Sequence, residues 1–212
     1  MPDALGPTED AKRRLMPRPL RAASILTAAS RAFARGGYAA TSMDDVAAEA
    51  DVSKLILYRH YDSKRDLYEA VLAEVETRLA AIEPRPAGLA GVSLDQAAGE
   101  AAATMLAILG VAREVPDAYR LLYQHAAHEP LFAARAARVK ETGVTRIASL
   151  LAPHVADATL LRWTARLVTA TADEAVLAWL DLGDPDRDAE AAERLVRTMG
   201  AMLAPLLAPR AG

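Results

Sequence analysis

The sequence predicts an all-α protein of about nine helices. Of the 212 residues, 52% are hydrophobic, alanine is the commonest, and only 2 are phenylalanine. This composition favours helices over strands, which prefer aromatic and β-branched residues. No stretch alternates between apolar and polar residues as a half-buried strand does, and prolines, glycines and capping residues divide the chain at helix-length intervals.

The bulk properties favour a cytoplasmic protein without membrane segments. The chain has no cysteine, which excludes a disulfide framework and a cysteine-ligated metal. Its N-terminus lacks the apolar core of a signal peptide, and the longest uncharged apolar stretch, residues 101–112, is too short to cross a bilayer. The net charge of −3 argues against indiscriminate nucleic-acid binding. Cations outnumber carboxylates only in residues 1–64, which favours an N-terminal segment that approaches a polyanion.

The N-terminal elements follow in a recognisable order. Residues 1–18 contain prolines and a basic run, and are typical of a disordered basic arm. The arm offers phosphate or minor-groove contacts, or it is simply a solvated tail. Apolar residues at helical spacing then predict a helix over 20–35, which Gly36 and Gly37 end.

Two short helices come next, each opened by a serine. Ser42 with Asp45 resembles a capping box, and Ser53 provides the cap of the second short helix. Ser63 repeats the pattern at the start of a longer helix that extends to about residue 82. The two short helices nearly abut, which is the layout of a helix-turn-helix motif.

The rest of the chain predicts a helical bundle. A proline- and glycine-rich break at 83–93 separates it from the N-terminal part. Five further helices are predicted at 94–113, 116–126, 129–152, 158–182 and 188–207.

The second short helix has the residues to contact DNA. In a helix-turn-helix motif it enters the major groove while the first short helix braces it. A helical wheel turns Leu57 inward and Leu55, Ile56 and Arg59 outward, with Lys54, Tyr58 and His60 on the flanks. Arg59 suits guanine, and the apolar pair suits thymine methyl groups. The alternative is that Tyr58 belongs to the core and that Arg59 and His60 are merely solvated.

Residues 21–72 resemble the DNA-binding domain of the tetracycline-repressor (TetR) family. The resemblance is carried by "FARGGYAATSMDDVA", then "VS", then "LYRHYDSKRDLY". This chain has Leu55-Ile56 where the family often has Gly-Thr, and Tyr61 where it usually has an apolar residue. By resemblance, the DNA-contacting positions are Thr41, Ser42, Lys54, Leu55, Ile56, Tyr58, His60 and Lys64. The helical wheel adds Arg59 to them.

The resemblance implies an architecture and a function. It implies an N-terminal three-helix helix-turn-helix domain over 19–64 and a C-terminal helical bundle for ligand binding and dimerisation over 65–212. It further implies a homodimeric repressor that binds a palindromic operator on double-stranded DNA and is released by a small-molecule effector. Dimerisation is expected through 158–182 and 188–207.

The C-terminal part offers residues for both roles. Leu195, Met199, Met202 and Leu206 recur at steps of four and three, as in a packing seam, whether between subunits or within one. Asp173 and Glu174 lie mid-helix, where they either pair with Arg162 or Arg166 across a dimer or are just exposed. Polar candidates for the effector pocket are Tyr119, Tyr123, His125, His128 and Trp163.

No enzyme, cofactor or metal site is expected. His125 and His128 share a helix face, but two histidines alone are weak evidence for a metal. We find no serine-nucleophile turn and no convincing metal-ligand set, so an all-helical enzyme is the least favoured alternative. The other alternative is a helix-turn-helix regulator that responds to no small ligand.

Overall fold

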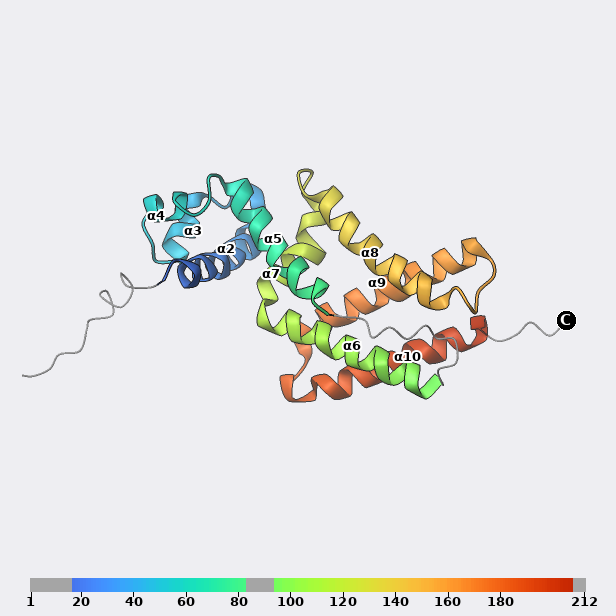
Figure 1. The fold of residues 1–212 in the computed structure, drawn as a ribbon. Coiled ribbons are helices and arrows are strands. Elements are labelled where there is room, and N and C mark those ends of the chain that lie inside the picture. The colour runs from blue at the N-terminus through green and yellow to red at the C-terminus, as the bar shows by residue number, and fades with distance from the viewer. Residues whose placement is uncertain (1–16, 83–93, 208–212) are drawn as a thin grey trace, which may run out of the picture. The chain divides into compact units, whose positions relative to one another are not determined.

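The protein is all-α, as predicted. The computed structural model describes residues 17–82 and 94–207 (Figure 1). Over those ranges it contains nine α-helices, two 3-10 turns and one π-helical segment, with no strand. The chain separates into two compact units, Met1–Leu72 (unit 1) and Ala73–Gly212 (unit 2), and the boundary falls inside helix α5. Within the described ranges, no helix is long and apolar enough to cross a membrane.

Unit 1 is a small bundle around an aromatic core. Its helices are α2 (Arg18–Ala40), α3 (Met43–Glu49), α4 (Lys54–Tyr58) and the first half of α5 (Lys64–Ala80). The rings of Phe33 and Tyr68, both fully buried, meet edge to face with centroids 5.0 Å apart. Such pairs add to the stabilisation from area burial. Val46 and Leu57, each 0% exposed, bring α3 and α4 into the same core, and Leu67, also 0% exposed, adds a second residue of α5.

The helix ends of unit 1 are fixed by local hydrogen bonds, as the sequence predicted. The Ser42 hydroxyl accepts from the backbone N–H of Asp45, whose carboxylate accepts from the Ser42 backbone N–H, which completes the capping box. Ser53 Oγ accepts from the N–H of Ile56 at 3.3 Å. Helix α2 is interrupted at Gly37, whose φ of 73° is the left-handed conformation that glycine adopts without strain.

Unit 2 consists of long helices packed in pairs. They are α6 (Leu94–Glu114), α7 (Pro116–Arg120), α8 (Ala133–Leu151), α9 (Ala158–Leu182) and α10 (Asp188–Leu207). Helix α10 packs along α6 and α8 along α9 (Figure 1). The structure departs from the predicted helix at 116–126, because α7 continues as a π-helical segment, Leu121–His125, and a 3-10 turn, Ala126–His128.

Arginine–carboxylate contacts join separate elements of unit 2. Arg113 of α6 donates to Asp188 at the start of α10, with the closest atoms 3.0 Å apart, and Trp179 Nε1 of α9 donates to the same carboxylate at 2.6 Å. Arg135 of α8 pairs with Glu76 at 2.6 Å. These contacts fix the order of the helices in unit 2.

Candidate nucleic-acid interface

Helix α4 presents two leucines to opposite environments. Leu57 is completely buried, whereas Leu55 is 63% exposed. Tyr58 is 42% exposed, Arg59 is exposed and Ile56 is half-buried. A monomer gains nothing from holding a leucine, a tyrosine and an arginine on one exposed helical surface, and such surfaces are typical of binding sites. The helical wheel predicted the exposure of Leu55 and Arg59, but Ile56, which it also turned outward, is half-buried, and Tyr58, which it placed on the flank, is exposed.

The orientation of α4 is fixed by its ends and its neighbour. Its N-terminus is held by the Ser53 cap, and helix α3 packs against it. At its C-terminus the backbone N–H groups of His60 and Tyr61 both donate to the carbonyl of Leu57, each at 3.0 Å. A five-residue helix has little stability of its own. It is therefore the caps and the buried Leu57 that give the outward side chains a defined direction.

Cationic and polar groups flank this surface. Lys54 Nζ lies 2.8 Å from the carboxylate of Asp44 on α3, and both side chains are exposed. Half-buried His60 has a pKa lowered first by burial and then by the charges of Arg18 and Arg21 on α2. At neutral pH its imidazole is therefore uncharged, and it offers one N–H donor beside two guanidinium groups.

The structure places Ser42 and Thr41 differently from each other. Ser42 is exposed at the N-terminus of α3, and its hydroxyl donates to Asp45 at 2.7 Å. Thr41, expected at the DNA, is 5% exposed, and its hydroxyl bonds to the carbonyls of Ala32 and Gly37. The Thr41 side chain therefore caps the end of α2 from inside the unit, and its burial separates it from the exposed Ser42.

Lys64 has a second role that the sequence did not reveal. Its ammonium group donates to the carbonyl of Tyr38 at 2.8 Å and to that of Ala39 at 3.2 Å, and it lies 4.5 Å from the centre of the Tyr38 ring. Two of its three N–H groups therefore hold the end of α2.

The five predicted effector residues do not form one site. Buried Tyr119 stacks on half-buried Tyr123 with ring centroids 4.6 Å apart. His125 is half-buried, and exposed His128 bonds through Nδ1 to the carbonyl of Gln124 at 2.8 Å. Trp163 is 55% exposed on α9. The structure brings together the two tyrosines alone of these five.

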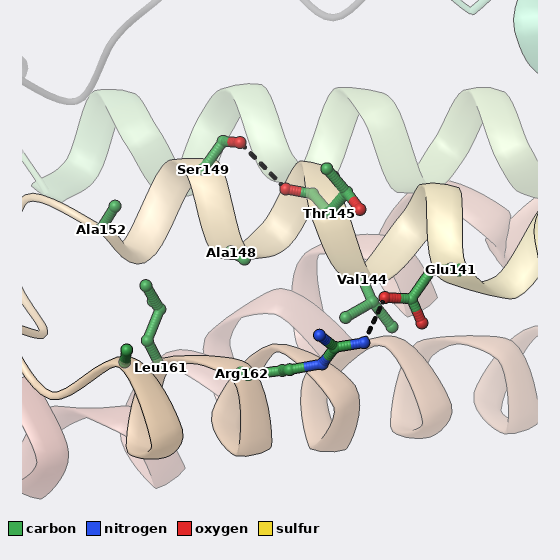
Figure 2. A pocket seen from close by; sticks show the side chains of 9 residues that line it. Glu141, Val144, Thr145, Ala148, Ser149, Ala152, Leu161 and Arg162 are labelled. Atoms are coloured by element: carbon green, nitrogen blue, oxygen red, sulfur yellow. Dashed lines mark hydrogen bonds and ion pairs between the residues drawn. The ribbon is translucent and has the colours of Figure 1, made fainter.

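Two depressions lie on unit 2, and none of the five residues lines either. Figure 2 shows the first, an open groove of about 330 Å³ between α8 and α9, with Leu161 and Ala148 on its walls and an Arg162–Glu141 ion pair of 2.9 Å across it. The second, about 240 Å³, lies among α6, α9 and α10. No group of three or more potential metal-ligating side chains occurs in the described part of the chain.

A protein-family model matches the N-terminal part of the chain. The model described as "Bacterial regulatory proteins, tetR family" matches residues 25–71, from within α2 to within α5. The matched segment contains every element that presents α4. Residues 25–71 therefore match the tetR family.

Curated relatives resemble this chain in the same N-terminal region. It is 49% identical over 57 residues to the HTH-type transcriptional activator FasR of Mycolicibacterium smegmatis, a match covering 27% of this chain and 26% of that protein. It is 45% identical over 69 residues to an HTH-type transcriptional repressor of Mycobacterium tuberculosis, covering 32% and 37%. The match spans only about a quarter to a third of the length of these relatives.

Solved structures extend the likeness in fold to most of this chain. A TetR-like transcriptional regulator from Rhodococcus sp. RHA1 superposes with a TM-score of 0.69 at 24% identity, covering 88% of this chain and 98% of that one. A tetR-family regulator from Streptomyces coelicolor gives 0.64 at 22% identity, covering 90% and 83%. At these identities the comparison shows the shared all-α fold.

Proposed function

We propose that this protein is a transcriptional regulator that binds double-stranded DNA by inserting α4 into the major groove. The observation that carries the proposal is the contrast on α4, where Leu57 is buried while Leu55, Tyr58 and Arg59 face outward. Helix α3 braces α4, as the first helix of a helix-turn-helix motif does. The match to the family model covers all of these residues.

The exposed groups divide by chemistry into two sets. Arg59, Leu55 and Ile56 carry the sequence preference, through guanine O6 and N7 and through thymine methyl groups. The residues that contact phosphates are Ser42, Lys54, Tyr58, His60 and Lys64, with Arg18 and Arg21 added from the structure. To bind a phosphate, Lys54 must break its ion pair with Asp44 or divide its N–H groups between the two acceptors. The negative charge of Asp44 also repels a phosphate nearby.

Selection of bound DNA from a random duplex pool tests DNA binding. We expect a palindrome, because two copies related by a two-fold axis read two half-sites. Arg59→Ala should then lower the discrimination against the wrong base at one position of each half-site by about 1–3 kcal/mol. The charge-matched control is Arg138→Ala, an exposed arginine of unit 2, which should leave the preference unchanged. Recovery of no consensus from the pool would contradict the proposal.

We propose that the chain acts as a homodimer through α9 and α10. One side of α9 is exposed in the monomer, and on it lie Trp163, Leu167, Ala170, Ala178 and Leu182 together with the charged residues Glu174 and Asp181. On α10, Met202 is 55% exposed. Leu195 and Met199 of the predicted seam are half-buried within the monomer, and the side chain of Leu206 lies outside the described residues. Apolar stripes on two neighbouring helices form a four-helix bundle when two subunits meet.

Sedimentation analysis tests the dimer with a matched pair of variants. Leu167→Glu places a charge on the α9 stripe and should shift the protein to monomer. Leu131→Glu adds the same charge at a leucine that is 55% exposed outside the stripe and should leave the dimer intact. A monomeric wild-type protein at micromolar concentration would contradict this proposal.

We further propose that an effector bound in unit 2 releases the protein from DNA and so relieves repression. The support is that α5 serves both units, with Leu67 in the core of unit 1 and Glu76 paired to Arg135 in unit 2. A ligand that favours one position of helix α5 shifts the DNA-binding equilibrium, and a coupling of about 3 kcal/mol changes affinity more than a hundredfold.

The test is a reporter gene behind the selected palindrome. The protein should silence the reporter, and the effector should restore its expression. Increased expression with the protein would instead identify an activator.

A further inference from the structure

A pocket of about 240 Å³ lies in unit 2 where α6, α9 and α10 meet. Helix α10 packs along α6, and α9 contacts both of them (Figure 1). The pocket is lined by the apolar side chains of Met105, Leu109 and Val176, which are at most 8% exposed. At about 30 Å³ for each water-sized group, it has room for roughly eight of them. An apolar group of that size that enters the pocket leaves water for hydrocarbon, which favours its binding.

Trp179 supplies the aromatic wall of this pocket, and the protein fixes its position. Its Nε1–H donates to Asp188 at 2.6 Å, and the same carboxylate accepts from Arg113 at 3.0 Å. The indole also lies against the backbone of Gly183, where an added Cβ would come within 2.3 Å of two ring carbons. Because the indole is already held on these sides, it loses little conformational freedom when a ligand packs on it.

Arg194 of α10 is the one charged residue among the described residues that line the pocket. Its side chain is 76% exposed, and its Nη2 donates to Glu190 Oε1 at 3.1 Å. Arg187 already donates to both carboxylate oxygens of Glu190, at 2.9 and 3.0 Å. Two guanidinium groups therefore share one carboxylate, and these three residues together carry a net positive charge. Arg194 also keeps N–H groups for a ligand, because a guanidinium has more donors than its bond to Glu190 uses.

The other side-chain donors of the pocket are already used within the protein. The Trp179 N–H is directed to Asp188, and the Thr198 hydroxyl donates to the carbonyl of Arg194 at 2.9 Å. The guanidinium of Arg194 is therefore the side-chain donor that a ligand meets in this pocket. Guanidinium groups bind carboxylates through paired, charge-assisted hydrogen bonds, and they repel cations. The pocket thus combines an apolar, aromatic interior with an anion-binding edge.

We propose that this pocket binds a small aromatic carboxylate, with its ring packed on Trp179 and its carboxylate paired with Arg194. A phenyl ring with a short aliphatic linker matches the volume of the pocket. The groove between α8 and α9 has no aromatic residue among the described residues that line it, so it does not offer the same combination. The proposal goes beyond DNA binding by α4 and does not depend on it.

Isothermal titration calorimetry of the full chain without DNA tests the site. The probes are 3-phenylpropionate, 3-phenylpropan-1-ol and 3-phenylpropylammonium, which share a ring and a linker and differ in charge. We expect the carboxylate to bind most tightly and the ammonium least tightly at pH 7.5. Arg194→Met keeps an unbranched side chain and should weaken carboxylate binding about fivefold, to the affinity of the alcohol. The matched control, Arg197→Met, removes an exposed arginine that does not line the pocket and should change nothing.

Two further variants separate the charge from the cavity. Glu190→Gln removes the carboxylate that competes for Arg194 and should strengthen carboxylate binding about twofold or more, a gain that a lost structural contact would not produce. Ala191→Leu adds volume at a half-buried position that lines the pocket and should abolish binding of all three probes. Its circular dichroism spectrum shows whether the helices are retained.

Four results would overturn the proposal. They are equal affinity for the three probes, no binding of the carboxylate at millimolar concentration, unchanged affinity in Arg194→Met, and full carboxylate binding in a folded Ala191→Leu variant. Because these measurements contain no DNA, failure of the site would leave selection of a palindrome by α4 unaffected. Failure of that selection would likewise leave carboxylate binding unaffected.

Discussion

Unit 1 and unit 2 satisfy their polar groups in different ways. In unit 1, helix ends are closed by residues three positions apart, such as Ser42 with Asp45 and Ser63 with Asp66. In unit 2, several polar contacts join residues far apart in the chain, such as Arg113 with Asp188 and Arg120 with Asp181. In unit 2 the buried Thr164 hydroxyl has no hydrogen-bond partner among the described residues.

Unit 1 therefore holds one exposed surface in a fixed orientation, whereas unit 2 has contacts that can change when a molecule binds. Local caps and an aromatic core hold the exposed side of α4 in one direction, which suits recognition of a rigid duplex. Unit 2 contains long-range ion pairs, which a bound molecule is able to replace, and the carboxylate of Asp173, which is unpaired among the described residues and which a bound molecule is able to pair with. Four substitutions test this difference between the units.

Leu57→Ala should have the largest effect. Leu57 is fully buried, so truncation should lower the free energy of unfolding of unit 1 by about 2–5 kcal/mol. The control is Leu55→Ala, two residues earlier and 63% exposed, which should cost under about 0.5 kcal/mol. Urea unfolding followed by circular dichroism measures both.

The same experiment tests whether the units unfold separately. Both tryptophans of the chain, Trp163 and Trp179, lie in unit 2. With separate unfolding, Leu57→Ala shifts the transition in circular dichroism and leaves the transition in tryptophan fluorescence in place. Equal shifts in both signals would show one cooperative unit and remove the basis of the comparison.

Asp188→Ala should destabilise unit 2 by about 2–3 kcal/mol, because it leaves Arg113 and the Trp179 indole without their common acceptor. Hydrogen bonds from Arg113 and Trp179 lower the pKa of Asp188 below its usual 3.8. A lowered carboxyl pKa adds stability above the unfolded-state value, and that stability is lost as the pH falls through the folded value. The variant should therefore lose its extra sensitivity to acid below about pH 4.

The control for this substitution is Asp181→Ala. Asp181 pairs with Arg120 at 2.7 Å but is 56% exposed, so its loss should cost about 0–1 kcal/mol. Tryptophan fluorescence during urea unfolding measures both variants. Equal destabilisation by the two would show that the Arg113 contact is no stronger than a surface pair.

Helix ends were predictable from the sequence, whereas partners between helices were not. Ser42, Ser53 and Ser63 were found from residues within three positions, because caps depend on local geometry. The exposure of Leu55 followed from helical periodicity alone. The burial of Thr41 depends on Ala32, and the attachment of Lys64 depends on Tyr38, 26 residues earlier. A pattern within a few residues does not predict a partner that lies so far along the chain.

The same reasoning explains the errors in unit 2. The π-helical segment at 121–125 departs from the regular spacing on which periodicity depends. Asp173 was expected to pair with Arg162 or Arg166 across a dimer or to be exposed; within the single chain it is half-buried, and both arginines pair with Glu141 of α8. Helical spacing gives the face of a residue but not which helix lies opposite it.

Asp173→Asn should stabilise unit 2 at neutral pH by about 1–2 kcal/mol. Burial raises the pKa of Asp173 from 3.8 to about 6, so the folded state disfavours the charged form. The destabilisation grows as the pH rises from 3.8 to about 6 and is constant above that range. The variant should therefore gain nothing at pH 3.5 and the full amount at pH 7.5. A destabilised variant at both pH values would show that the carboxylate has a partner in solution.

Ser53→Ala should have the smallest effect, about 1 kcal/mol, from loss of the hydrogen bond that Ser53 Oγ accepts from Ile56. Its effect on DNA should exceed its effect on stability, because α4 has five residues and no other side-chain cap at that end. Fluorescence anisotropy with the selected palindrome measures the binding.

Ser53→Asp restores the cap but adds a negative charge near the phosphates, so it should recover stability without recovering affinity. If Ser53→Ala lost stability and kept full affinity, the direction of α4 would not depend on its cap, and the contrast between the two units would be one of stability alone.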